Sequence, residues 1–175
     1  PYWVSYPEMV RLCGAVPVPA VPEDGSLVPT AEDIISRVGR QTKAIIINSP
    51  NNPSGLMYPR EVIRDVVEFC EKEGIYLITD DIYHKLIFDG VTWPSPYDFT
   101  KKSIEDSRLI VINGVSKGYA MTGWRIGYLA GPEDLVRAMR KVQGQSTSCP
   151  GSVSQAAAVA ALNGPQDCVA EMRRA

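Results

Sequence analysis

Lys117 is the residue with the clearest capacity for covalent chemistry. It lies in the segment GVSKG (114–118), a loop of small residues that directly follows an apolar run. A lysine amine held in such a loop, partly removed from water, can attack a carbonyl carbon and form a Schiff base. The ordinary alternative for a lysine is a solvated surface position, so its predicted neighbours decide between the two.

Four other polar residues suit a ligand that carries a ring and a phosphate. Asp80 follows an apolar run and can pair with a bound cation such as a pyridinium, or act as a simple cap. Tyr83 and Asn52 can both hydrogen-bond to an oxygen on that ring; their ordinary roles are packing and a proline–glycine turn. Arg125 can hold a phosphate with two parallel hydrogen bonds, or form a salt bridge.

The hydrophobic pattern predicts the elements that must position these residues. Apolar, β-branched runs at 43–48, 75–79, 108–112 and 125–130 predict strands. Helical spacing predicts helices from Pro59 to Gly74, from 132 to about 142, and from 152 to about 161. The opening residues 1–4 suggest a strand that passes into a loop, and the segment 89–107 matches no element.

Alternating strands and helices favour an α/β fold in three α/β/α layers with a mostly parallel sheet. Ligands bind such sheets at the carboxyl ends of the strands. The polar segments 48–55, 80–83 and 113–117 each follow a predicted strand. We therefore expect Asn52, Asp80, Tyr83 and Lys117 to meet at one edge of the sheet.

Composition argues against several other classes. The chain has 175 residues and a net charge of -2, which gives no general attraction to nucleic acid or acidic membranes. No apolar run approaches the roughly 20 residues of a membrane span. Four scattered cysteines and one histidine predict neither a metal site nor a disulfide framework, and favour a cytoplasmic location.

The segment GVSKG also matches the G-x-S-x-G nucleophile elbow of α/β-hydrolases. That fold needs a histidine downstream of the serine, whereas His84 lies upstream of Ser116. A complete triad would require a histidine from outside these residues. Neither a G-x-G-x-x-G fingerprint nor a P-loop sequence is present.

Four separated segments resemble the class I aminotransferases, pyridoxal-phosphate (PLP) enzymes of fold type I, and are most similar to bacterial aspartate and related aminotransferases. The segments are PYWVSYP (1–7), NSPNNPSG (48–55), DDIY (80–83) and SKGYAMTGWRIGY (116–128). The likeness runs in order over essentially the whole chain. It implies a PLP-dependent transfer of an amino group between an amino acid and a 2-oxo acid.

The resemblance implies a role for each matching position. Lys117 corresponds to the lysine that forms the aldimine and shuttles a proton, and Asp80 to the partner of the pyridine nitrogen. Asn52 and Tyr83 correspond to the hydrogen-bonding pair on the ring hydroxyl. The remaining cofactor positions are Arg125 and Ser116 at the phosphate and Trp3 stacked on the ring.

The resemblance also implies the surroundings of the chain. Residues 1–175 correspond to part of the PLP-binding large domain, with the small domain and the N-terminal arm outside the chain. Family members act as homodimers, so a homodimer is expected of the full-length protein. No metal, nucleic acid or membrane partner is expected.

Two positions depart from the family pattern, and two other functions share its motifs. Gly114 stands where many members carry a phosphate-binding serine. Asp81 replaces a common glutamate, which we expect to be a surface change without consequence. A PLP-dependent carbon–sulfur β-lyase would use the same lysine, aspartate and arginine, and some transcription regulators carry an aminotransferase-like domain that senses PLP.

Overall fold

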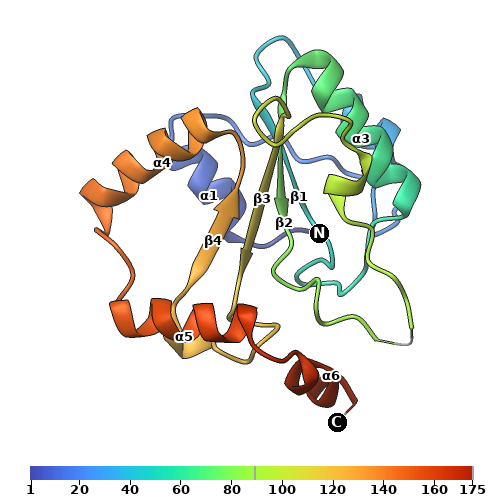
Figure 1. The fold of residues 1–175 in the computed structure, drawn as a ribbon. Coiled ribbons are helices and arrows are strands. Elements are labelled where there is room, and N and C mark those ends of the chain that lie inside the picture. The colour runs from blue at the N-terminus through green and yellow to red at the C-terminus, as the bar shows by residue number, and fades with distance from the viewer. Residues whose placement is uncertain (89, 175) are drawn as a thin grey trace.

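A four-stranded sheet forms the centre of the computed structural model, which describes residues 1–88 and 90–174 (Figure 1). The strands lie in the order β1-β2-β3-β4. Pairings β1–β2 and β2–β3 are parallel, and β4 runs antiparallel to β3. The strands are β1 (Ala44–Asn48), β2 (Tyr76–Asp80), β3 (Leu109–Gly114) and β4 (Gly127–Ala130). The predicted α/β fold with a mostly parallel sheet is confirmed.

Helices flank the sheet on both sides, with α3 on one side and α1 and α4 on the other (Figure 1). The α-helices are α1 (Ser5–Leu12), α2 (Ala31–Ile35), α3 (Arg60–Glu73), α4 (Glu133–Ser146), α5 (Ser152–Asn163) and α6 (Asp167–Arg174). Two short 3-10 helices are η1 (Pro96–Phe99) and η2 (Thr122–Trp124). None of the helices among the described residues combines the length and the apolar character that a membrane span requires.

The main core lies between α3 and one face of the sheet. Helix α3 starts after Pro59 and ends at Gly74, whose φ of 71° closes the helix in the left-handed conformation that glycine adopts easily. It buries one apolar stripe, made by Val62, Ile63, Val66, Val67 and Cys70. The stripe packs on Leu77 and Leu109, each 1% exposed.

The opposite sheet face is less covered. Ile46, Ile112 and Leu129 remain 36%, 38% and 36% exposed. Because successive side chains of a strand point to opposite faces, Asp80 belongs to this second face and its neighbour Thr79 to the α3 face.

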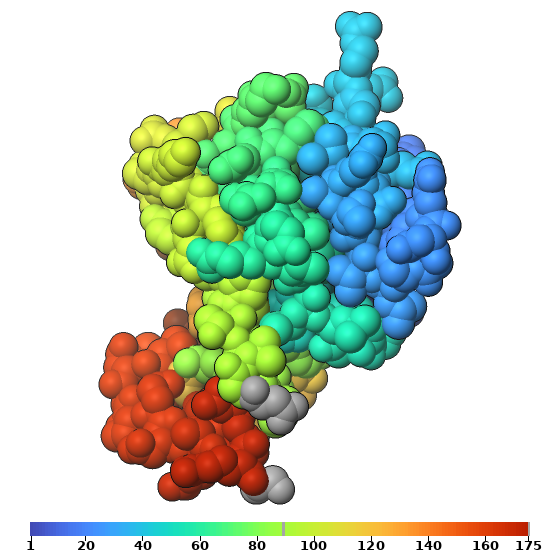
Figure 2. All heavy atoms as spheres, turned by 90° about the vertical axis from the view of Figure 1, so that its right-hand side faces the viewer, coloured from blue at the N-terminus to red at the C-terminus, as the bar shows by residue number. Residues whose placement is uncertain are grey.

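A second, smaller core joins the β3–β4 connection to α5. It consists of Val115, Ile126 and Ala158, with Tyr119 and Met121 packed against it. In the space-filling view the C-terminal helices form a lobe beside the body built around α3 (Figure 2). The β3–β4 connection, which carries Lys117, is therefore held in place by the buried apolar side chains of this second core.

The structure differs from the sequence expectations mainly outside the sheet. Residues 1–4, where a strand passing into a loop was expected, form no strand, and α1 begins directly after them at Ser5. The segment 89–107, to which the sequence assigned no element, contains η1. Phe99 of η1 makes a cation–π contact with Arg60, the first residue of α3. Asp89 lies outside the described residues.

Candidate functional site

The ends of β1 and β2 are tied together by Asn48. Its side-chain amide donates a hydrogen bond to the backbone oxygen of Asp80 (2.8 Å), and its side-chain oxygen accepts one from the backbone N–H of Asn52 (2.8 Å). Asn48 is only 3% exposed. The first two polar segments thus meet at the sheet edge as expected, through a residue to which the sequence had given no role.

The Asp80 carboxylate is held by two donors. The Tyr6 hydroxyl donates to Oδ2 (2.6 Å), and the backbone N–H of Ile82 donates to Oδ1 (3.2 Å). Burial and the hydrogen bond to Asp80 raise the pKa of Tyr6 well above its usual value, so this tyrosine stays protonated and donating. The carboxylate is therefore fixed in position and keeps its charge partly compensated.

Sequence reasoning missed Tyr6, although it lies inside the segment 1–7 that carries the family likeness. The only available signal was an aromatic residue five positions after the start of that segment. Trp3, the predicted ring-stacking residue, contacts Tyr6 edge to face with ring centroids 5.5 Å apart and is 39% exposed. Trp3 thus contacts Tyr6, and Tyr6 in turn holds the Asp80 carboxylate.

Asn52, Tyr83 and Lys117 form the other half of the site. The Asn52 amide lies 3.5 Å from the Tyr83 hydroxyl, at the long limit of a hydrogen bond. The Lys117 amine lies over the Tyr83 ring, 5.8 Å from its centroid. These three predicted residues are brought together from the ends of β1, β2 and β3.

The Lys117 connection is anchored on both sides of the lysine. Val115, two residues before it, is fully buried. Tyr119, two residues after it, donates to the side-chain oxygen of Gln166 (2.8 Å), and the Lys85 amine lies over the Tyr119 ring at 5.4 Å. This network links the segments of Tyr83 and Lys117 to the connection between α5 and α6.

Ser116 and Arg125 are linked to one another through Thr122. The Thr122 hydroxyl donates to the backbone oxygen of Ser116 (3.0 Å), and the Arg125 guanidinium donates to the backbone oxygen of Thr122 (3.1 Å). Arg125 is exposed and has a φ of 56°, a left-handed conformation that few non-glycine residues adopt. None of the ion pairs found among the described residues involves Arg125.

The glycine at 114 has a steric explanation. A Cβ built on Gly114 would lie 2.8 Å from the backbone oxygen of Ile126 and 3.0 Å from the side chain of Ile82. The Ile126 oxygen accepts a hydrogen bond from the backbone N–H of Val115 and cannot easily move aside, so the serine that the resemblance leads one to expect at position 114 would be crowded in this chain.

Asp81 is not the surface residue that the sequence suggested; that expectation was wrong. Its exposed fraction is 2%, and among the described residues its carboxyl has a single hydrogen-bond partner, the Thr79 hydroxyl at 3.5 Å. Burial raises the pKa of the Asp81 carboxyl to about 7, and the neighbouring charge of Asp80 adds to the effect. The alternation that points Asp80 to one face turns Asp81 toward the other.

Taken together, the sheet edge carries a carboxylate, an amide–phenol pair and an amine. This donor set can hold a planar aromatic ring that bears a basic nitrogen, a hydroxyl oxygen and an aldehyde. The described residues contain no group of three or more His, Cys, Asp or Glu side chains placed to hold a metal ion.

The family model of class I and II aminotransferases matches residues 1–175. The chain belongs to this family. The family uses PLP, and the donor set described above fits that cofactor in chemical type.

Similar aminotransferases come from several bacteria and an archaeon. The aspartate aminotransferase of Bacillus sp. (strain YM-2) is 46% identical over the whole chain, which covers 44% of that relative. The probable aspartate/prephenate aminotransferase of Thermus aquaticus is 44% identical over 93% of the chain and 41% of its own length. The chain thus spans less than half the length of these relatives.

Solved structures of aminotransferases share the fold. The aspartate aminotransferase of Rhizobium meliloti superposes with a TM-score of 0.89 at 41% identity, over 99% of this chain and 43% of that one. An aromatic aminotransferase from Pyrococcus horikoshii gives the same TM-score at 32% identity, over 99% and 46% of the two chains.

Proposed function

We propose that the protein containing this chain is a PLP-dependent aminotransferase that moves an amino group between an amino acid and a 2-oxo acid. The observation that carries the proposal is the convergence at one sheet edge of Asp80, which Asn48 ties to Asn52, the Asn52–Tyr83 pair and Lys117. In this proposal residues 1–175 contribute most of the contacts to the cofactor ring, as part of the large domain of a cytoplasmic homodimer.

Each side chain has a distinct task in the proposed site. Lys117 supplies the amine that binds the cofactor covalently and then moves a proton at the substrate α-carbon. Asp80, oriented by Tyr6 and Ile82, pairs with the protonated ring nitrogen. When bound, the cofactor supplies the electron sink for the reaction.

The remaining contacts orient the ring. Asn52 and Tyr83 present an amide N–H and a hydroxyl to the ring oxygen. Arg125 offers two parallel donors to the phosphate, with Ser116 close by. Trp3 offers an exposed aromatic face for offset stacking on the ring.

Trapping of the cofactor on a single lysine tests the assignment. The whole protein is incubated with PLP, reduced with borohydride and analysed by peptide mass spectrometry. We expect a stable adduct on Lys117 that is lost in Lys117→Ala and retained in Lys72→Ala, which removes an exposed lysine in the last turn of α3. An adduct of unchanged yield in Lys117→Ala would refute the central role of this residue.

Product analysis separates the possible reactions. Several relatives are named aspartate aminotransferases, so aspartate with a 2-oxo acid acceptor is the first substrate pair to assay. Conversion of bound PLP to pyridoxamine phosphate by aspartate supports the transferase. Release of pyruvate and ammonia from a cysteine conjugate, without pyridoxamine phosphate, indicates a β-lyase, and binding of PLP without turnover indicates a sensor domain.

A further inference from the structure

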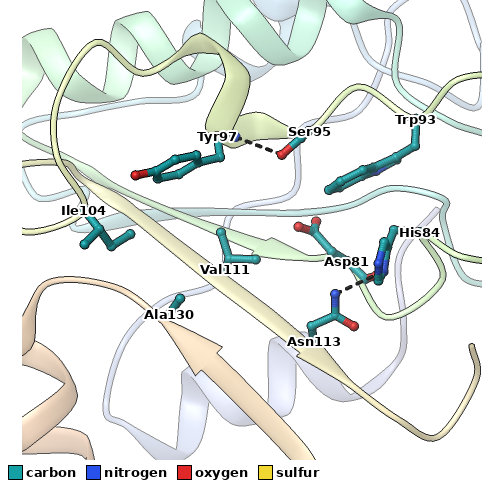
Figure 3. Close-up of a pocket in the computed structure, with 9 residues that line it drawn as sticks. All are labelled: Asp81, His84, Trp93, Ser95, Tyr97, Ile104, Val111, Asn113 and Ala130. Atoms are coloured by element: carbon teal, nitrogen blue, oxygen red, sulfur yellow. Dashed lines mark hydrogen bonds between the residues drawn. The ribbon is translucent and has the colours of Figure 1, made fainter. Parts of the chain in front are cut away.

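A cavity of about 450 Å³ lies on the α3 face of the sheet (Figure 3). Strand alternation places Val111 and Thr79 on this face and Asp80 on the opposite one. The floor of the cavity is formed by Val111 and Ala130, paired residues of β3 and β4, with Ile104 beside them. The volume is in the range of small-molecule sites. This cavity shares no lining residue with the proposed cofactor site.

The cavity contains a buried carboxyl without a counter-charge. The Asp81 side chain points into it (Figure 3) and is 2% exposed. Among the described residues Asp81 takes part in no ion pair, and the sole hydrogen bond of its side chain is the long one from the Thr79 hydroxyl. A buried carboxylate left in this state is unfavourable unless it is protonated or meets a cation.

Aromatic rings form the walls above Asp81. The Trp93 indole is held in place because its N–H donates to the backbone oxygen of Ser49 (3.0 Å). The His84 ring lies 5.3 Å from the Trp93 ring, and Tyr97 lines the cavity farther along. Rigid aromatic faces near a carboxylate are the combination that binds organic ammonium ions.

No side chain of the cavity already supplies that positive charge. Among the described residues that line the cavity, His84 alone can become cationic, and burial lowers the pKa of its imidazole, so it is neutral at pH 7. Its Nδ1 lies 2.8 Å from the backbone oxygen of Asp81 and 3.0 Å from the Asn113 amide nitrogen. The Lys85 amine is engaged with Tyr119 and Gln166.

We propose that this cavity is a second binding site, which takes a small organic ammonium ion with its charge at Asp81 and its apolar body between Trp93 and the β3–β4 floor. An anion is disfavoured because the Asp81 carboxylate would repel it. A neutral molecule is disfavoured because it would leave the buried charge of Asp81 without a counter-charge. The site is independent of the proposed transaminase reaction.

Benzyltrimethylammonium is a suitable probe because its charge does not titrate and it cannot react with an aldehyde. Binding to the whole protein is measured by calorimetry at pH 8, with benzyl alcohol and benzoate as neutral and anionic counterparts. We expect the cation alone to bind. Absence of cation binding, or equal affinity for the neutral and cationic probes, would overturn the proposal.

Two variants locate the site. Asp81→Asn keeps the shape of the side chain and is expected to weaken cation binding by about 30-fold, as for loss of one partner of a buried charge pair. Asp98→Asn, an exposed change of the same type in η1, should leave binding unchanged. Trp93→Leu should weaken cation binding while leaving Asp81 intact, so it replaces Asp81→Asn as the test if that variant folds poorly. Unchanged cation binding in both site variants contradicts the proposal.

The pH profile of the unmodified protein gives a test that needs no substitution. The titratable groups at the cavity are Asp81, His84 and Tyr97, with Asp80 acting from the strand end and Lys85 beside His84. Protonation of Asp81 should weaken cation binding as the pH falls below 7, by about tenfold over the first pH unit, and the loss should level off near the roughly 30-fold effect expected for Asp81→Asn. Asp81→Asn should flatten this profile; a profile that is already flat in the unmodified protein overturns the assignment to Asp81.

Discussion

The substitution Asp81→Asn should make the stability of the protein depend differently on pH. The pKa of the Asp81 carboxyl is raised from 3.8 to about 7 in the folded chain, chiefly by burial. The folded state therefore holds this proton more tightly than the unfolded state. Between about pH 4 and pH 7 the unfolded chain has lost the proton while the folded chain retains it, so the group destabilises the fold increasingly as pH rises.

The size of the effect follows from the shift. Each pH unit in this interval lowers the free energy of unfolding by about 1.4 kcal/mol, with a ceiling of about 4 kcal/mol above pH 7. Asparagine carries no titrating proton, so the stability of Asp81→Asn relative to the unmodified protein should rise over the same interval and then level off. A constant offset from burying the amide does not alter this slope.

Denaturant unfolding of the apoprotein at half-unit steps from pH 4 to pH 8.5, without organic cations, measures the slope. Titratable groups that both proteins contain contribute equally to the two free energies of unfolding, so their contributions cancel when one is subtracted from the other. Asp98→Asn is the matched control because its side chain is exposed, and it should show no comparable slope. A stability difference between Asp81→Asn and the unmodified protein that stays constant within about 0.5 kcal/mol over this range would refute the argument from burial.

Three further substitutions probe the positioning of the site. Tyr6→Phe removes the 2.6 Å hydrogen bond to Asp80 and should lower the free energy of unfolding by about 1.5 kcal/mol and weaken cofactor retention; unchanged values for both would show that Tyr6 does not support the carboxylate. Gly114→Ser should destabilise the fold by about 1–3 kcal/mol because its Cβ would meet a main-chain oxygen, whereas Gly123→Ser, with open space around it, serves as the neutral control in thermal unfolding. Leu77→Ala should remove about 2–5 kcal/mol in denaturant unfolding because the side chain is 1% exposed in the main core, and a loss under 1 kcal/mol would contradict that packing.

The sheet and the sheet-edge cluster could be predicted because they depend on local pattern. Continuous apolar runs marked β1, β2 and β3, and polar residues directly after each run marked the edge where Asn52, Asp80 and Lys117 meet. The order of strands and helices then determined that these ends lie together.

The missed features depend on contacts between distant segments. Tyr6 reaches Asp80 across 74 residues of sequence, and α1 carries no buried residue that would have marked it as a core helix. Asp81 looked like a surface residue because it is charged, and its burial results from the covering segment 90–107, which has no regular pattern. Such contacts are decided by packing, which single-residue propensity does not record.

Strand β4 runs antiparallel to β3, so a short connection that contains Lys117 is enough to join them. Gly114 pairs with Gly127 across a short connection, whereas Ala44 and Tyr76 pair only after the whole of α3 has been crossed. Loop-closure entropy grows with the length of chain that is closed, so the β3–β4 pairing is the least demanding in the sheet. The proposed cofactor lysine thus lies on the connection whose strand pairing closes the shortest stretch of chain in the sheet.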